Sequence, residues 1–474
     1  MKPQARSGGL QVHSGRKSLT LAELCLFLTV AFVPFQQVFT VSVGFPLKLS
    51  EIFAGLGCFF CVVGGARARS SFAGWPLLAV FTVIIGASTL IAALTPLPVA
   101  SAPGYSLGFT LDLLQYTAYA ILVIATAYLM ATRIGADVIV RATSVAVRLA
   151  ALYALVQIGL WLAGSSSVLA IVNGNIQFGR AFGTNLPRNG SFLEGNYLGF
   201  FAAFAFFTSL RGATVRRRTV DCFLAVALLL YSQSTSALAG LIVGIGVMLI
   251  LRPDVRAGTA LVGSVIPILG LAFAFVPSVT AYADHQLGKL GLGPAAAAGD
   301  SISYSSRTRT LNADAGIGMG WDHAGAGVGA GRFGVYQPSY ADFSTVPAGY
   351  SSGIRPITPS AFVQIFAEHG LFAFLAFTLL LVALAWRVRR INRLDFALAV
   401  FLFVGLNATP SWTVMTIWIA IAYLAARAGE GRTPSSEPLT SMSARPERSN
   451  RVTRGSSVRN SRPRSLAASQ HRPT

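Results

Sequence analysis

The sequence contains few charged residues, and acidic ones are especially scarce. Only 11% of its 474 residues are charged, and 17 of them are Asp or Glu. A soluble domain carries about 25% charged residues, so this chain lacks the charge that a solvated surface needs. A hydrophobic content of 53% and a mean hydropathy of +0.61 agree with this. The composition excludes an ordinary soluble protein and indicates a membrane protein.

Cysteine and metal-binding patterns are also scarce. The four cysteines are Cys25, Cys58, Cys61 and Cys222. All lie in apolar blocks, so nothing suggests a disulfide framework, and the C-x-x-C at Cys58 fits packing in a helix better than redox chemistry. No zinc-like spacing of His and Cys and no Ser-His-Asp set is visible, so we expect no metal ion and no cofactor.

The apolar residues fall into blocks long enough to cross a bilayer. Blocks of about 17–25 residues span the hydrocarbon core as helices. We therefore predict an all-α membrane protein with about 12 transmembrane helices and one large extracytoplasmic loop. The predicted spans are 19–39, 49–65, 75–94, 109–131, 138–163, 192–210, 220–231, 236–251, 257–276, 360–386, 396–406 and 412–426.

The basic residues orient these spans. The chain holds 37 Lys and Arg, for a net charge of +20. Most lie in alternate loops and in the two tails, as the positive-inside rule requires when both termini are cytoplasmic. The loops predicted to be cytoplasmic begin with Arg67, Arg133, Arg211, Arg252 and Arg387. The positive charge therefore concerns placement in the membrane and contact with lipid head groups, and we expect no binding to nucleic acid.

This topology divides the chain into five parts. They are a cytoplasmic segment at 1–18, spans one to nine at 19–276, an extracytoplasmic loop at 277–359, spans ten to twelve at 360–427, and a basic cytoplasmic tail at 428–474. The tail is rich in Ser, Arg and Pro and is predicted to be disordered. A loop as long as the extracytoplasmic one is usually functional or disordered.

A first polar constellation opens the sixth span from the extracytoplasmic side. Arg188, Glu194 and Asn196 lie in the sequence Arg-Asn-Gly-Ser-Phe-Leu-Glu-Gly-Asn. Ionisable groups are tolerated at the head-group boundary, and the free N–H groups of a helix N-terminus favour an anion such as a phosphate. A plain helix cap with one arginine reaching the interface is the alternative.

A second constellation lies in the long loop. Arg307 and Arg309 precede a glycine-rich stretch that includes Gly329, Gly331 and Arg332. Arginine suits a diphosphate because its planar fork of donors stays charged and binds oxyanions in pairs. The stretch also matches G-x-G-x-x-G, but it lacks the strand–turn–helix setting of a dinucleotide site, so we interpret it as a glycine-rich turn beside an arginine.

The third constellation enters the tenth span from outside. Gln364 and Glu368 are four residues apart and share one helix face in the outer half of the membrane. A carboxylate at that depth normally faces the bundle interior or a wet cavity. A structural hydrogen bond between helices is the alternative.

These motifs together resemble the O-antigen ligase and O-antigen polymerase superfamily of envelope glycosyltransferases. The order of motifs from residue 188 to residue 386 is similar: Arg-x-x-Gly-x-Phe-x-Glu-x-Asn, a Ser-rich turn, a loop arginine before Gly-x-Gly-x-Gly-x-Phe, and Gln-x-x-x-Glu-x-Gly. The chain departs from the family at Pro359 and Ser360, where many ligases carry His-Asn, and at Thr235, where Arg is common. Glu194 looks more like the polymerase and exopolysaccharide branch.

The resemblance implies a membrane glycosyltransferase of the bacterial inner (plasma) membrane. It would polymerise or ligate polyprenyl-diphosphate-linked oligosaccharides on the extracytoplasmic face, without a metal, onto a glycan or surface-molecule acceptor. The resemblance also implies polysaccharide-assembly proteins as partners. The implied catalytic residues are Arg188, Glu194, Arg307, Arg309 and Glu368, and the implied substrate-binding residues are Asn196, Gly329, Gly331, Arg332 and Gln364. A saccharide transporter of the flippase kind and a purely structural membrane protein are the alternatives; the lack of central charge in the spans favours the enzyme over transport.

Overall fold

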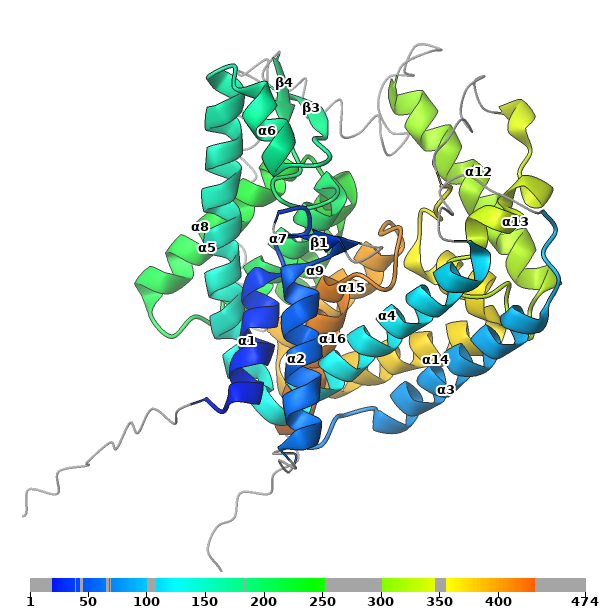
Figure 1. Cartoon of the computed structure of the whole chain (residues 1–474). Helices are drawn as coiled ribbons and strands as arrows, with labels where there is room; N and C mark the ends of the chain where they lie inside the picture. The colour runs from blue at the N-terminus through cyan, green and yellow to red at the C-terminus, as the bar shows by residue number, and fades with distance from the viewer. Residues whose placement is uncertain are drawn as a thin grey trace, which may run out of the picture. The chain divides into compact units, whose positions relative to one another are not determined.

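The computed structural model describes residues 19–38, 40–42, 46–64, 68, 70–99, 108–181, 184–251, 301–345 and 355–430. The predicted ninth span, the N-terminal segment 1–18 and nearly all of the predicted tail lie outside the described residues. The described part is mostly helical, as the sequence predicts, with two short antiparallel hairpins (Figure 1).

Every predicted span except the ninth coincides with a helix. The helices that match the predicted spans are α1 Leu21–Phe32, α2 Leu49–Val63, α3 Trp75–Leu94, α4 Phe109–Leu129, α5 Gly135–Leu162, α7 Gly195–Ser209, α8 Val215–Ser232, α9 Thr235–Ile250, α14 Ala361–Ile391, α15 Arg393–Leu406 and α16 Met415–Glu430. A π-helical turn, Met130–Ile134, joins α4 to α5. The hairpins are β1 Val41–Ser42 with β2 Pro46–Leu47, and β3 Phe178–Ala181 with β4 Thr184–Pro187.

Three segments of the described chain are long and apolar enough to cross a membrane: Trp75–Leu94, Phe109–Leu162 and Ala361–Ile391. The outward side chains of α3 support a lipid environment, because Val83 is 70% exposed and Leu94 is 79% exposed. A soluble monomer rarely exposes a continuous apolar face of this kind. That the other predicted spans also cross the bilayer, which would make about twelve, stays a prediction.

Helix α16 lies at the centre of the bundle. Its residues from Met415 to Ala426 are all buried, and it packs against α4, α5, α14 and α15. A helix that is apolar around its whole circumference is stable only when other helices surround it. By sequence this span is a weak candidate because it is short. In the structure the surrounding helices bury it, so it need not face lipid along its length.

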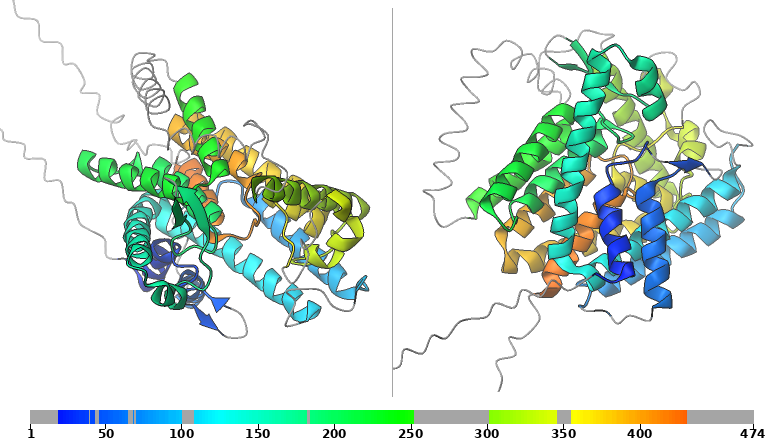
Figure 2. Two further views of the ribbon diagram at one scale, coloured as in Figure 1. Left: turned by 90° about the horizontal axis from the view of Figure 1, so that it is seen from above. Right: turned by 60° about the vertical axis from the view of Figure 1, so that its left-hand side comes forward.

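The segment predicted to be a long extracytoplasmic loop contains ordered helices. Helix α6 Ser166–Val172 precedes the β3–β4 hairpin, whereas α12 Ser301–Asp322, α13 Phe333–Tyr340 and a 3₁₀ turn Phe343–Thr345 lie in the loop itself. Helices α12 and α13 lie together at the N-terminal end of α14 (Figures 1 and 2). Glycines on α12 permit this close approach, since a Cβ on Gly320 would lie 2.3 Å from the ring of Phe366.

Helix α14 is broken at Gly370, where the glycine-rich loop reaches it. Gly370 has φ +80°, a left-handed value that side chains rarely adopt. The break frees the N–H of Leu371, which donates to the carbonyl oxygen of Ala324 at 2.8 Å. The sequence predicts one continuous span here, because a single internal glycine does not signal a break.

We expect Gly370→Ala to destabilise the protein by about 3 kcal/mol, through left-handed strain and a steric clash. The new Cβ would lie 2.6 Å from the carbonyl oxygen of Ala324. Thermal unfolding in detergent measures the effect. Gly86→Ala in α3 is the matched control, because nothing lies within 4 Å of its Cβ position. Equal melting temperatures for the two variants would contradict the role of the break.

Buried ion pairs join helix ends that the topology places on one side. Asp395, at the start of α15, is 1% exposed. Its carboxylate accepts from Arg211 at 2.6 and 3.0 Å, from Arg427 at 3.1 Å and from the Tyr423 hydroxyl at 2.7 Å. Arg211 follows α7 and Arg427 lies near the end of α16. These three chain segments are all predicted to be cytoplasmic, so their meeting agrees with the alternation of spans.

Candidate functional site

Arg188 is held at the entrance to α7 by two neighbouring segments. Its guanidinium donates to the Ser232 carbonyl oxygen at 3.4 Å and to the Gln177 side-chain oxygen at 3.3 Å. The same Gln177 oxygen accepts from the Gly195 N–H at 2.9 Å, so Gln177 fixes both the arginine and the first residue of the helix. The Arg188 guanidinium is therefore held in one position by the protein. An arginine that only reaches the membrane interface does not require such contacts.

Glu194 and Arg309 share this region with Arg188. Glu194 is the N-cap residue of α7 and lies outside the helix. Burial raises the pKa of its carboxyl group, while the charges of Arg188 and Arg309 act to lower it. Burial lowers the pKa of Arg188, where Glu194 opposes the shift and Arg309 adds to it. Residues from the predicted first and second constellations therefore lie close enough to interact.

The third constellation holds the glycine-rich loop instead. Glu368 is 2% exposed; its carboxylate accepts the backbone N–H of Phe333 at 3.4 Å and the side-chain amide of Gln364 at 3.1 Å. The N–H groups of Val328 and Gly329 donate to the carbonyl oxygens of Ala367 and Glu368 at 3.0 and 2.8 Å. This geometry favours a positioning role for Glu368.

The loop needs its glycines for this contact. Gly327, Gly329 and Gly331 all have positive φ, and a Cβ on Gly327 would lie 2.3 Å from the backbone of Glu368. Gln364 also contacts the turn between α15 and α16, because its side-chain oxygen accepts the backbone N–H of Trp412 at 3.2 Å. The Gln364–Glu368 pair therefore makes structural hydrogen bonds to two other segments of the chain.

Arg355 is a cation near the glycine-rich loop that sequence reasoning missed. Its guanidinium lies 4.6 Å from the centre of the Tyr116 ring and donates to the Gly331 carbonyl oxygen. Its position just before Pro356, in a loop with few basic residues, is the signal that identifies it in retrospect. Gln177 was also missed, since a single glutamine carries no motif.

Two tyrosines lie between the residues around Arg188 and those around the glycine-rich loop. Tyr197, on α7, lies close enough to Glu194 and to Tyr116 for electrostatic interaction. Tyr116, on α4, interacts in the same way with Arg355 and Glu368. The predicted site residues therefore line one continuous region that runs from Arg188 to the glycine-rich loop.

The remaining predicted residues lie around this region. Arg307 is exposed on α12, and only Arg309 interacts with both Arg188 and Glu194. Asn196, the second residue of α7, is partly buried. Arg332 is 3% exposed, and its guanidinium donates to the carbonyl oxygen of Ala92. Within the described ranges, no group of three or more His, Cys, Asp or Glu side chains forms a candidate metal site.

The Ser-rich turn packs directly on the site helix. Ser234 caps α9, with its hydroxyl accepting the Ala237 N–H at 3.4 Å. A Cβ on Gly199 of α7 would lie 2.4 Å from the Cβ of Ser234. The turn therefore supports the helix that begins at Glu194.

Comparison with protein families finds a match that covers part of this region. Residues 222–378, from α8 to the middle of α14, match the family described as O-antigen ligase. No match was found among curated proteins. The match includes the Ser-rich turn, the loop arginines, the glycine-rich loop and the Gln364 motif, whereas Arg188 and Glu194 precede it. Residues 222–378 are therefore similar to the O-antigen ligase family, in agreement with the motifs of the sequence.

Proposed function

We propose that the protein transfers a glycan from a polyprenyl-diphosphate-linked oligosaccharide to an acceptor glycan on the extracytoplasmic face of the bacterial inner membrane. One observation carries this proposal: at the predicted outer end of α7, the charges of Arg188, Glu194 and Arg309 lie close enough to interact electrostatically. The family match supports transfer from a lipid-linked donor. The apolar helices support a multi-pass membrane protein.

The arginines would act on the leaving group. In the reaction, an acceptor hydroxyl oxygen bonds to the anomeric carbon as the bond from that carbon to the diphosphate oxygen breaks. Negative charge then develops on the departing diphosphate, and preorganised cations stabilise such charge most strongly. Arg188, fixed by Gln177 and Ser232, is suited to this role. Arg309, with Arg307 two residues before it on α12, would complete the site, so that no metal ion is needed.

Glu194 would act on the acceptor. A carboxylate whose pKa is raised by burial is a stronger base than an ordinary one and accepts the proton of the attacking hydroxyl more readily. Asn196, Gly329, Gly331, Arg332 and Gln364 remain proposed substrate-binding residues. Glu368 would act indirectly, by holding the glycine-rich loop.

Purified protein in proteoliposomes tests the proposal. With the host's lipid-linked oligosaccharide and neither ATP nor an ion gradient, we expect new glycosidic bonds and release of polyprenyl diphosphate. A longer glycan still on its lipid carrier indicates a polymerase, and transfer to a different surface molecule indicates a ligase. Movement of the oligosaccharide across the bilayer without any new bond would instead support the transport alternative and reject the enzyme.

A further inference from the structure

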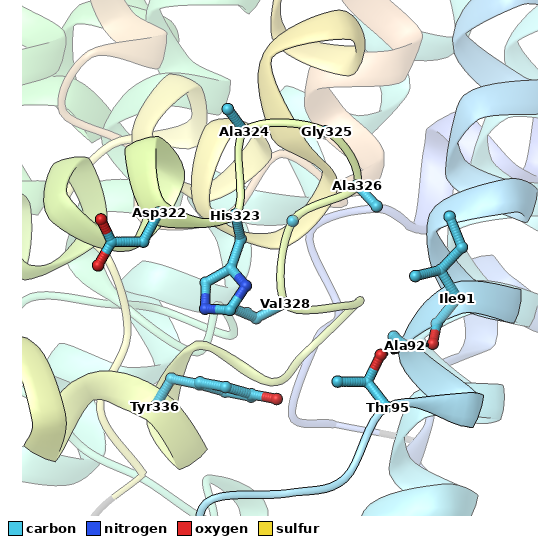
Figure 3. Close-up of a pocket in the computed structure, with 11 residues that line it drawn as sticks. Ile91, Ala92, Thr95, Asp322, His323, Ala324, Gly325, Ala326, Val328 and Tyr336 are labelled. Atoms are coloured by element: carbon cyan, nitrogen blue, oxygen red, sulfur yellow. Dashed lines mark hydrogen bonds between the residues drawn. The ribbon is translucent and has the colours of Figure 1, made fainter.

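A small cavity lies beside the glycine-rich loop, and neither Arg188 nor Arg309 lines it. Its volume is about 190 Å³, and it lies between the end of α3, the loop after α12 and helix α13 (Figure 3). The lining residues are Ile91, Ala92, Thr95, Asp322, His323, Ala324, Gly325, Ala326, Gly327, Val328 and Tyr336. Pockets for drug-sized ligands measure about 300–1,000 Å³, so this one has room for only a single small ring.

Two side chains in this cavity have hydrogen-bonding capacity that the protein leaves unused. The rings of His323 and Tyr336 lie 5.5 Å apart at 74° (Figure 3). Across the described ranges, neither the His323 imidazole nor the Tyr336 hydroxyl makes a hydrogen bond within the protein. Tyr336 is 7% exposed as a whole residue, and its hydroxyl points across the cavity toward Thr95 (Figure 3). A polar group that lines a cavity without a protein partner is available to a bound ligand or to ordered water.

Thr95 adds an acceptor on the opposite wall. Its hydroxyl donates to the Ile91 carbonyl oxygen at 2.8 Å and keeps its lone pairs for an incoming donor. The cavity thus offers donors and acceptors on facing sides, with apolar surface from Ile91, Ala92 and Val328 between them.

The lining offers no cation for a diphosphate. It contains no Lys or Arg, and its one carboxylate, Asp322, points away from the His323 ring (Figure 3). A neutral ligand rich in hydroxyl groups fits this combination of a tyrosine ring, an imidazole and hydroxyls.

We propose that this cavity binds one neutral sugar ring of the acceptor glycan. The inference rests on the proposed transferase function and extends it from the reacting groups to acceptor recognition. The lining loop is also rigidly connected to the site, because the Val328 N–H donates to the Ala367 carbonyl oxygen, next to Glu368. A sugar held here would be positioned by the same loop whose far end contacts Arg355.

Binding of soluble glycan to the purified full-length protein tests the inference directly. The probe is a set of short oligosaccharides released by partial hydrolysis of the host's own surface polysaccharide, and titration calorimetry gives the Kd. We expect Tyr336→Phe and His323→Ala each to weaken binding about tenfold, as expected for the loss of one well-placed hydrogen bond. Ser339→Ala, which also removes one hydroxyl from the same helix but at an exposed position outside the cavity, is the matched control and should bind like the wild type.

Each result decides between the two proposals. An absence of binding to the wild-type protein, or wild-type affinity in both cavity variants, overturns the inference, whatever the elongation assay gives. Normal binding without any transfer by the wild-type protein overturns the proposed function and leaves the cavity assignment standing. If His323→Ala lowers the melting temperature, Tyr336→Phe decides alone, because it removes a single oxygen atom.

Discussion

We expect the Arg188→Ala protein to form glycosidic bonds about 100 to 1,000 times more slowly than the wild type, the usual cost of removing one preorganised group that stabilises transition-state charge. The guanidinium is fixed by Gln177 and by the carbonyl oxygen of Ser232, so no neighbouring cation can replace it without rearrangement. The rate is measured as polyprenyl diphosphate released by purified protein. Arg309→Ala should act in the same direction, because Arg309 interacts with the same pair.

The controls separate charge from geometry. Arg188→Lys keeps the positive charge but loses the planar fork, so its activity should lie between the wild type and the alanine variant. Arg216→Ala removes an exposed arginine from the first turn of α8 and should retain full activity. Wild-type rates in both Arg188→Ala and Arg309→Ala would exclude these arginines from diphosphate binding.

The second large effect concerns stability. We expect Asp395→Asn to lower the free energy of unfolding by about 3 kcal/mol, because the substitution removes the counter-charge of Arg211 and leaves Arg427 only the more exposed Glu430. The side chains of Arg211 and Arg427 are only 21% and 17% exposed, so water compensates incompletely. Thermal unfolding in detergent measures the loss, with exposed Asp137→Asn as the matched control.

A triple variant distinguishes the ion pairs from simple packing. Replacing Asp395 by Leu together with Arg211 and Arg427 by Met removes these three charges at once and leaves only Glu430, the more exposed partner of Arg427. Apolar replacement of a whole buried ion cluster is often neutral or stabilising. Recovery of the melting temperature in that variant would confirm that unpaired charge causes the loss. A triple variant no more stable than Asp395→Asn would contradict this explanation.

Sequence reasoning located most helices because a bilayer demands a minimum apolar length. Helix α3 begins and ends where the hydropathy pattern predicts, at Trp75 and Leu94. Glu194 directly precedes α7, as the polar constellation predicts. These features depend on local sequence alone, so a single chain is enough to predict them.

Features that depend on contacts between distant parts of the chain could not be predicted from the sequence. The break at Gly370 forms because Ala324, far away in the chain, supplies a carbonyl oxygen for Leu371. The sequence predicts Glu368 as a catalytic residue. Its hydrogen bond with the backbone N–H of Phe333 could not be inferred, because Phe333 belongs to another segment of the chain. The roles of the predicted site residues stay predictions until the variants above are measured.

The burial of α16 has a consequence for biosynthesis. A ribosome delivers the N-terminal part of a chain first, so α4, α5 and α14 are made before the helix that they surround. The earlier helices are therefore made before the helix that packs between them. The hydrogen bond between Asp395 and Arg427 forms only after α16 has taken its place among them. Completion of the bundle is thus coupled to translation of its last described helix.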